Sequence, residues 1–415
     1  MNIINKTYKD SPLGKIPGDW EVRIGEEISD KITKGSSPNW QGFKYQTEGV
    51  LFVTSENVRD GYLDVAEPKY LPFSFNDKLK NSILKKGDIL INIVGASIGR
   101  SCIYNIEKVA NTNQAVCIFR PKETMIREYI SYFLQSPKSI EKLLNTQSDS
   151  ARPNLTLEDL RSFHFLLPPL PEQKAIAHVL GLMDSTINTN NQLISKKELQ
   201  KKWLMQNLLT GKKRIRGFDN ERWKTKLLED VLIPVSRPID KPLSAFLALG
   251  IRSHGKGTFL KYDFEPGKID MDTLFVVREN DLIVNITFAW EGAIAIVKKE
   301  DEGALVSHRF PTFTFNLANG IIDYFRHYIL QPKFKYLMDL ISPGGAGRNR
   351  VLSKKDFLKL EVKIPSPEEQ TAIAQVLKAA DREIQLLRTK AEKLREQKKG
   401  LMQVLLTGKK RLMII

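Results

Sequence analysis

Apolar residues recur with one spacing in two long segments of the chain. From Ile373 to Leu405 they alternate steps of four and three residues, with the polar Lys398 at one of these positions, and the segment from Ile176 to Leu208 keeps the same register. Polar residues interrupt the first segment at Asn190, Lys197 and Lys201. This spacing is the heptad seam of a coiled coil, so the pattern predicts two long helices that bury their seams against each other in antiparallel orientation. The predicted helix-pairing positions are Ile176, Leu180, Met183, Ile187, Ile194, Leu204, Leu208, Ile373, Leu377, Ala380, Ile384, Leu387, Leu394, Leu401 and Leu405.

Capping residues mark the ends of both predicted helices. Ser366, Pro367 and Glu369 have the spacing of a capping box at the start of the second helix. Gly211 and Gly408 suit the left-handed cap that ends a helix. Each helix would hold about 37 residues and extend roughly 55 Å. An alternative is that each helix packs onto its own globular unit instead of onto the other helix.

The two helical segments are copies of each other. Residues 172–214 match residues 369–411 at a constant offset of 197 without a gap, and both copies end in Leu-Leu-Thr-Gly-Lys-Lys-Arg. The preceding segments repeat more weakly, for example around Trp20 and Trp223. A period of this length indicates duplication of a domain together with its connector, which gives a pseudo-two-fold internal repeat. The predicted parts are residues 1–170, 171–216, 217–366 and 367–415.

The segments outside the helices are predicted to be mixed α/β (α+β) domains. Short apolar and β-branched runs bounded by Gly, Pro or Asp indicate strands. These runs are Leu51–Thr54, Asp88–Val94, Ala115–Pro121, Thr273–Val277, Asp281–Thr287, Ala293–Val297 and Phe310–Phe315. A short helix is expected late in each domain, at Glu128–Leu134 and at Ile321–Leu330.

The charge of the chain favours a polyanionic partner. Its 415 residues include 64 Lys and Arg against 48 Asp and Glu, which gives a formal net charge of +16. Such an excess favours nucleic acid over a merely solvated basic surface or a membrane surface. No stretch approaches the roughly 18 apolar residues of a membrane-spanning helix, and Met1 to Gly18 lacks the apolar core of a signal peptide. Because Cys102 and Cys117 have neither metal-ligand nor disulfide spacing, we expect a cytoplasmic protein without a metal site.

The repeated segments resemble a known protein family. The pattern from Pro169 to Asp184 recurs from Ser366 to Asp381, and the ending Leu-Leu-Thr-Gly-Lys-x-Arg follows each copy. Both features, found twice and in this order, resemble the specificity subunits of Type I restriction-modification systems. The resemblance covers the arrangement of the whole chain, whereas the two variable domains match only in general form.

This resemblance implies a set of partners. Two target-recognition domains would each contact one half of a bipartite site in double-stranded DNA, and the paired helices would set the spacing between the half-sites. Two modification subunits, which bind S-adenosylmethionine and methylate adenine, would dock on the helices. Restriction subunits would complete the ATP-dependent nuclease, so that S-adenosylmethionine, ATP and Mg²⁺ belong to the partners and this chain holds no cofactor.

The sequence itself shows no catalytic motif. The motifs of amino-methyltransferases and the phosphate-binding loop are missing. Thr210–Lys213 is better explained as a helix end than as a phosphate loop, and Asp356, Glu361 and Lys363 imitate a nuclease cluster at too short a spacing. The Gly-rich segment 343–348 suggests a mobile loop or a contact with the DNA backbone. The chain is therefore predicted to be non-catalytic alone; the alternatives are a self-contained nuclease or methyltransferase and a coiled-coil scaffold without a DNA site.

Polar side chains in Gly-bounded loops are the candidates for DNA contact. Arg and Lys would bind phosphates, and Arg, Asn or Gln would bind base edges. The candidates in the first domain are Lys34, Ser36, Ser37, Asn57, Arg59, Ser97, Arg100, Asn113, Gln114 and Arg152. Those in the second are Arg237, Arg252, Ser253, His254, Lys256, Trp290, His308, Arg309, Arg348, Asn349 and Arg350.

Overall fold

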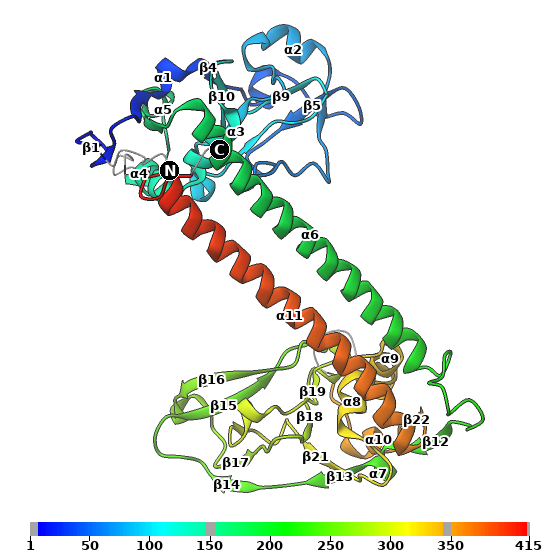
Figure 1. The fold of residues 1–415 in the computed structure, drawn as a ribbon. Coiled ribbons are helices and arrows are strands. Elements are labelled where there is room, and N and C mark those ends of the chain that lie inside the picture. Colours follow the sequence, from blue (N-terminus) through cyan, green and yellow to red (C-terminus); the bar gives the residue numbers. More distant parts are fainter. Residues whose placement is uncertain (1–6, 146–153, 343–349, 413–415) are drawn as a thin grey trace. The chain divides into compact units, whose positions relative to one another are not determined.

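The chain folds into two compact units. The computed structural model describes residues 7–145, 154–342 and 350–412 (Figure 1). Unit 1 comprises residues 1–191 and 389–415, and unit 2 comprises residues 192–388. The long helices α6 (Leu170–Leu208) and α11 (Pro367–Leu405) hold 39 residues each, and each contributes one part to either unit.

Two small sheets and two strand pairs form the β-structure of unit 1. The four-stranded sheet has the order β4-β10-β7-β8 and the three-stranded sheet the order β6-β5-β9, in which β5 and β9 are parallel. Strand β3 pairs with β11, and β1 pairs with β2. The strands are β1 (Tyr8–Lys9), β2 (Ile16–Pro17), β3 (Glu21–Ile24), β4 (Ser29–Lys34), β5 (Val50–Val53), β6 (Tyr70–Leu71), β7 (Ile89–Asn92), β8 (Ser101–Ile103), β9 (Ala110–Thr112), β10 (Val116–Pro121) and β11 (His164–Leu167).

Unit 2 repeats this topology with a larger second sheet. Its four-stranded sheet has the order β13-β21-β18-β19, and its five-stranded sheet the order β14-β17-β20-β15-β16, in which β15 and β20 are parallel. Strand β12 pairs with β22, as β3 does with β11. The strands are β12 (Lys224–Leu227), β13 (Leu232–Val235), β14 (Pro238–Asp240), β15 (Phe246–Ile251), β16 (Thr258–Phe264), β17 (Thr273–Val276), β18 (Leu282–Val284), β19 (Ile294–Ile296), β20 (Leu305–Val306), β21 (Thr312–Phe315) and β22 (Glu361–Ile364).

Short helices complete each unit. They are α1 (Gly25–Ile28), α2 (Ser74–Lys78), α3 (Arg127–Gln135), α4 (Pro137–Asn145) and α5 (Leu157–Arg161) in unit 1 and α7 (Leu228–Val231), α8 (Ile322–Tyr328), α9 (Pro332–Leu340) and α10 (Lys354–Leu358) in unit 2. The predicted α/β class is confirmed, and each predicted strand run and short helix overlaps an observed element of the same type. The hairpin of β15 and β16 was not predicted, because its first strand is interrupted by Gly250 and its second alternates charged with aromatic residues.

The long helices take part in the core of each unit. In unit 1 the buried side chains of Ile176 and Leu180 from α6 join Leu405 from α11 in one cluster with Trp20. In unit 2 the cluster contains Leu377 of α11 together with the end of α6. Every predicted helix-pairing position is buried or half-buried. The two alternatives considered from the sequence therefore both apply, because the helix ends pack on the globular domains while the helices also contact each other.

Ion pairs join α6 and α11 in antiparallel orientation within each unit. In unit 1 Lys398 binds Asp184 at 2.6 Å. In unit 2 the repeat equivalents Lys201 and Asp381 bind each other in the same way, and Lys197 binds Glu383 at 2.8 Å. The lysines that interrupt the seam are thus used as partners of carboxylates on the facing helix. The antiparallel helix pair predicted from the sequence is confirmed.

Each unit also has a carboxylate buried at the start of a long helix. Glu369, with no exposed surface, accepts bonds of 2.7 Å from Nε and a terminal nitrogen of Arg214 and one of 3.1 Å from Trp223 Nε1. Glu172 binds Arg411 at 2.6 and 2.7 Å and Trp20 Nε1 at 3.1 Å. The predicted capping box is wrong, because Glu369 is engaged with these partners and the buried Ser366 Oγ has no hydrogen-bond partner.

The helix ends agree with the sequence. Gly211 and Gly408 have φ values of +71° and +70°, a conformation in which glycine is strongly favoured. Arg214 and Arg411 lie three residues after these glycines, and each binds the buried carboxylate at the start of the facing helix. Thr210–Lys213 thus lies in the turn that directly follows the end of α6 at Leu208, in agreement with its interpretation as a helix-end segment. No helix in the described part of the chain has the length and apolarity needed to span a membrane.

Candidate nucleic-acid interface

The candidate loops of unit 1 follow strand ends that lie at one edge of its sheets. Lys34 ends β4, Asn57 follows β5, Ser97 lies between β7 and β8, and Asn113 lies between β9 and β10. The backbone ties these loops to one another, since Gly35 N donates to Asn113 O at 3.1 Å. The buried Asn92 at the end of β7 donates to Ser55 O at 2.9 Å and to Ser97 Oγ at 3.1 Å. Residues from four separate parts of the sequence are thereby brought together.

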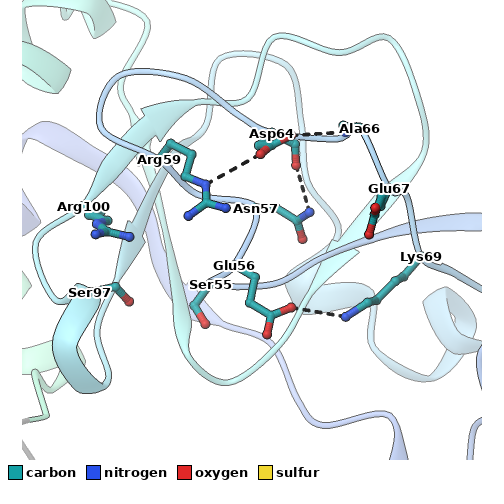
Figure 2. Close-up of a pocket in the computed structure, with 10 residues that line it drawn as sticks. All are labelled: Ser55, Glu56, Asn57, Arg59, Asp64, Ala66, Glu67, Lys69, Ser97 and Arg100. Atoms are coloured by element: carbon teal, nitrogen blue, oxygen red, sulfur yellow. Dashed lines mark hydrogen bonds and ion pairs between the residues drawn. The ribbon is translucent and has the colours of Figure 1, made fainter. Parts of the chain in front are cut away.

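A polar hollow of about 610 Å³ opens among these loops (Figure 2). Charged residues that line the hollow form ion pairs with one another: Arg59 lies 3.7 Å from Asp64, and Lys69 lies 3.2 Å from Glu56. The lining residues are Ser55, Glu56, Asn57, Arg59, Asp64, Ala66, Glu67, Lys69, Ser97 and Arg100. With carboxylates and cations side by side, the hollow presents acceptors as well as donors, a combination that suits base edges better than phosphates.

Asn57 has a structural role within this hollow. Its Oδ1 accepts from Thr54 N at 2.8 Å and from Thr54 Oγ1 at 3.0 Å, while its Nδ2 donates to Asp64 O at 2.8 Å. Its amide therefore fixes the loop after β5. Arg59 and Arg100, whose side chains are half-buried at the wall of the hollow, remain the better candidates for base contact (Figure 2).

The candidate loops of unit 2 lie at the corresponding edge. Arg252 to Lys256 form the tip of the β15–β16 hairpin, Trp290 lies between β18 and β19, and His308 and Arg309 lie between β20 and β21. The exposed side chains here include those of Arg252, Lys256, His308 and Arg309. Because β15 and β20 are parallel, the loops that follow them emerge at the same edge of the sheet.

The hairpin tip of unit 2 is fixed in position. His254, with a φ of +62°, donates its backbone N–H to Glu291 O at 2.9 Å, and Gly255 donates to Gly292 O at 3.0 Å. Ser253 Oγ donates to the Glu291 carboxylate at 2.5 Å. Trp290 is the residue before Glu291, and the Arg350 guanidinium lies 5.3 Å from the centre of its ring. The tip is therefore a rigid surface with two exposed cations, Arg252 and Lys256.

A second hollow, of about 370 Å³, lies beside this tip and is mainly apolar, with several phenylalanine rings in its wall. Phe259, Phe288 and Phe310 contribute to its wall, and Ser253, Asn285 and Glu291 contribute polar groups. Asn285 is the counterpart of Asn92 in the repeated strand pattern. The two units thus have hollows of different chemistry at corresponding edges.

Some predicted residues are not brought to these edges. Arg237 is half-buried and binds Asp281 through two contacts of 2.5 and 3.0 Å. Unit 1 has a similar pair, in which Asp88 accepts from Arg120 at 2.6 and 2.8 Å, and these hydrogen bonds raise the pKa of Arg120. Both pairs stabilise the sheets. Arg152, Arg348, Asn349 and the Gly-rich segment 343–348 lie outside the described residues.

The sequence reading missed two residues at these edges. Lys335 of α9 lies 3.4 Å from His254 Nδ1, a contact between residues far apart in the sequence. Trp40 follows the candidates Ser36 and Ser37 and is 77% exposed. A large aromatic residue in a polar loop was a signal that could have identified Trp40.

The features that imitate catalytic sites do not assemble. Asp356 lies in the first turn of α10, where its backbone N–H binds Ser353 Oγ at 3.3 Å, and Glu361 and Lys363 are exposed on β22. Across residues 7–145, 154–342 and 350–412, no group of three or more His, Cys, Asp or Glu side chains could hold a metal ion.

Known proteins match the chain over nearly its whole length. Residues 17–199 and 266–396 match the family described as the Type I restriction modification DNA specificity domain. The putative type I restriction enzyme MjaX specificity subunit of Methanocaldococcus jannaschii is 26% identical over 97% of this chain and 96% of its own length. The MjaVIII specificity subunit of the same organism is 30% identical over 52% of this chain and 51% of its own length.

Solved structures share the fold. A crystal structure of the HsdS subunit from Thermoanaerobacter tengcongensis covers 96% of this chain and 100% of its own, with a TM-score of 0.51 and 14% identity. The type I restriction-modification S subunit from M. genitalium covers 93% of this chain and 96% of its own, with a TM-score of 0.53 and 15% identity. Because the family model spans well over half of the sequence, the resemblance found in the repeats is confirmed. The chain belongs to the family of Type I restriction-modification DNA specificity domains.

Proposed function

We propose that this chain selects the DNA target of a Type I restriction-modification complex and that each unit contacts one half of a bipartite site. The observation that supports this most directly is the gathering of separate polar loops at one edge of the sheets in both units. Specificity subunits are non-catalytic, so S-adenosylmethionine, ATP and Mg²⁺ would be bound by the partner subunits. The alternative of a self-contained nuclease or methyltransferase predicts turnover by the purified chain with Mg²⁺ or S-adenosylmethionine, and we expect none.

The difference between the two hollows supports recognition of unlike half-sites. The hollow of unit 1 offers charged donors and acceptors, whereas that of unit 2 offers aromatic surface with a few polar groups. Polar groups distinguish bases by hydrogen bonds, while apolar surface favours contacts such as that with the thymine methyl group. We therefore expect selection from random DNA, with the modification subunit present, to yield two different half-sites separated by a fixed gap.

Arg252 provides a test of this assignment. One of its terminal nitrogens donates to Thr258 O at 2.8 Å, and its guanidinium lies 4.9 Å from the centre of the Phe259 ring, so the group is held in place with donors to spare. We expect Arg252→Ala to relax the sequence preference in one half-site only and to weaken binding by roughly 10-fold. Lys363→Ala, which removes an exposed cation from β22, is the control. Equal effects of the two variants would contradict the assignment.

We propose that the outward faces of α6 and α11 dock the modification subunits. Leu199 and Trp203, one helical turn apart on α6, are 67% and 47% exposed, and Leu386 on α11 is 62% exposed. Exposed apolar residues grouped on a helix face are typical of a protein interface. Leu199→Ala combined with Trp203→Ala should release a modification subunit in native mass spectrometry, whereas Leu317→Ala, 61% exposed in a loop, should not.

We also propose that the two helices set the gap between half-sites. Both have 39 residues, and their sequences align without a gap. Lengthening both by seven residues adds one heptad, which preserves the seam, and extends each helix by about 10 Å. The selected gap should grow by about three base pairs at roughly 3.4 Å per step while both half-sites stay the same. An unchanged gap would refute this role.

A further inference from the structure

The side chain of Trp40 is exposed to solvent, and the turn that contains it is fixed by hydrogen bonds. The 3₁₀ turn Asn39–Gln41 lies between Pro38 and Gly42, whose φ of +80° ends it. Gln41 Nε2 donates to Ser36 Oγ at 3.0 Å, and the backbone N–H groups of Gln41 and Phe43 both donate to Pro38 O. The turn therefore keeps one conformation while the indole of Trp40 remains 77% exposed.

The other side of the turn is anchored by the core of unit 1. The ring of Phe43 packs edge-on against that of Phe75 with centroids 5.2 Å apart, and Phe75 is fully buried. Lys78 Nζ donates to Gln41 O at 3.3 Å. Because the residues on both sides of Trp40 make these contacts, its exposure is a property of a rigid loop.

The position of Trp40 links it to the candidate interface. Its loop begins at Lys34 and includes Ser36 and Ser37, and Gly35 of the same loop is bonded to Asn113. Among the described residues no other aromatic side chain is as exposed; the next are Tyr262 at 72% and Phe73 at 66%. The exposed lysines Lys44 and Lys78 flank the turn. In this arrangement the indole of Trp40 could contact a base pair step while the two lysines bind the neighbouring phosphates.

We propose that Trp40 inserts its indole against an unstacked base in the half-site bound by unit 1. This inference rests on the proposed function, because it assumes that the strand-end loops contact DNA. An apolar wedge of this kind partly separates two base pairs and kinks the duplex, and an aromatic ring stacks on the base it exposes. Pyrimidine–purine steps are the easiest to unstack. The half-site of unit 1 should therefore contain such a step at a fixed position.

The test uses the complex of this chain with the modification subunit, bound to DNA that the same complex has selected from random sequences. The adenine of the predicted step is replaced by 2-aminopurine, whose fluorescence rises when it is unstacked, and a second duplex has the probe in the other half-site. Wild-type protein should raise the fluorescence of the first probe several-fold. Trp40→Ala should abolish this rise and weaken binding by about 10-fold. Trp40→Leu, which keeps an apolar wedge, should retain most of the rise.

Phe73→Ala is the matched control, because it removes a similarly exposed aromatic ring of unit 1 from another loop. It should change neither fluorescence nor affinity. If Trp40→Ala binds as tightly as wild type with the same fluorescence, the wedge is overturned while DNA recognition stands. If Trp40→Ala instead loses the modification subunit in gel filtration but the assembled fraction binds normally, Trp40 contacts protein and the wedge is overturned. A wild-type complex without sequence preference would overturn both proposals.

Discussion

Replacing Glu369 by glutamine tests how far the buried carboxylates hold each unit together. The carboxylate is fully buried and binds Arg214 at two positions of 2.7 Å, with a third bond from Trp223 at 3.1 Å. Glutamine has the same shape but no charge, and its amide nitrogen would face the guanidinium as a second donor. Arg214 is only 17% exposed, so the variant leaves a largely desolvated cation without a counter-ion.

The expected cost can be estimated from this geometry. Removing one partner of a buried ion pair destabilises by roughly 3–5 kcal/mol, and the partial exposure of Arg214 favours the lower end, about 3 kcal/mol. Glu172→Gln should cost less, about 1–2 kcal/mol, because Arg411 keeps a second carboxylate: its terminal nitrogens bind Asp19 at 2.8 and 2.9 Å. These bonds also lower the pKa of Asp19. The residue of unit 2 that corresponds to Asp19 is Arg222, which provides no such replacement.

Urea unfolding monitored by tryptophan fluorescence and calorimetry would measure both effects. A loss of about 3 kcal/mol should lower the midpoint temperature of unit 2 by roughly 6–12 °C. Glu368→Gln is the control, since Glu368 is exposed on the same turn, and it should change stability by no more than about 0.5 kcal/mol. The reasoning would be refuted if Glu369→Gln cost no more than Glu368→Gln or less than Glu172→Gln.

Three further predictions concern other described contacts. Burial lowers the pKa of His327, so the folded unit takes up fewer protons than the unfolded chain as pH falls below about 6.5, and the free energy of unfolding should decline there. The variant His327→Tyr introduces the residue found at the equivalent position of unit 1, Tyr132. It should flatten this decline, which urea titrations at several pH values would measure. Lys201→Glu would oppose Asp381 with a like charge and cost about 1 kcal/mol, most of which Asp381→Lys in the same chain should restore, and additive losses would contradict the pairing. Burial raises the pKa of the Cys102 and Cys117 thiols to about 12, so both should react with a thiol reagent only after unfolding, and rapid labelling of the native chain would exclude their burial.

The seam and the strands could be predicted because their patterns are local. A heptad spacing from Ile373 to Leu405 defines a helix face without any knowledge of its partner. The engagement of Glu369 could not be found this way, because Arg214 and Trp223 lie about 150 residues before it in the chain, and a glutamate near a helix start fits a capping box equally well. The repeat did contain a usable signal: Glu369 and Arg214 each have an identical counterpart, Glu172 and Arg411. Antiparallel pairing makes each such contact occur twice.

The sequence predicted which loops form the candidate site, but it could not predict which side chains in them are already bound to other residues. Gly and Asn in the segments after β5 and β7 indicated turns with polar side chains, and the structure places several of them at one edge. Sequence alone could not separate Arg59, which lines the hollow, from Asn57, whose amide is occupied by Thr54 and Asp64. Arg237 shows the same limit, since its carboxylate partner Asp281 lies 44 positions further along the chain.

The distribution of retained and altered residues has a physical reason. Glu172, Arg411 and their counterparts are buried and bound to each other, so a change in one leaves the other as an unpaired buried charge. Arg59 at the wall of the unit 1 hollow is half-buried and Arg252 at the tip of the β15–β16 hairpin is exposed, so that either residue can change at little cost to folding. Substitution of Arg59 or Arg252 should therefore alter DNA preference while stability stays within about 0.5 kcal/mol, whereas substitutions of the buried carboxylates should lower stability and leave the preference of the folded fraction intact. This separation of the structural residues from the proposed recognition surface would allow duplicated units to keep one architecture while they bind unlike sequences.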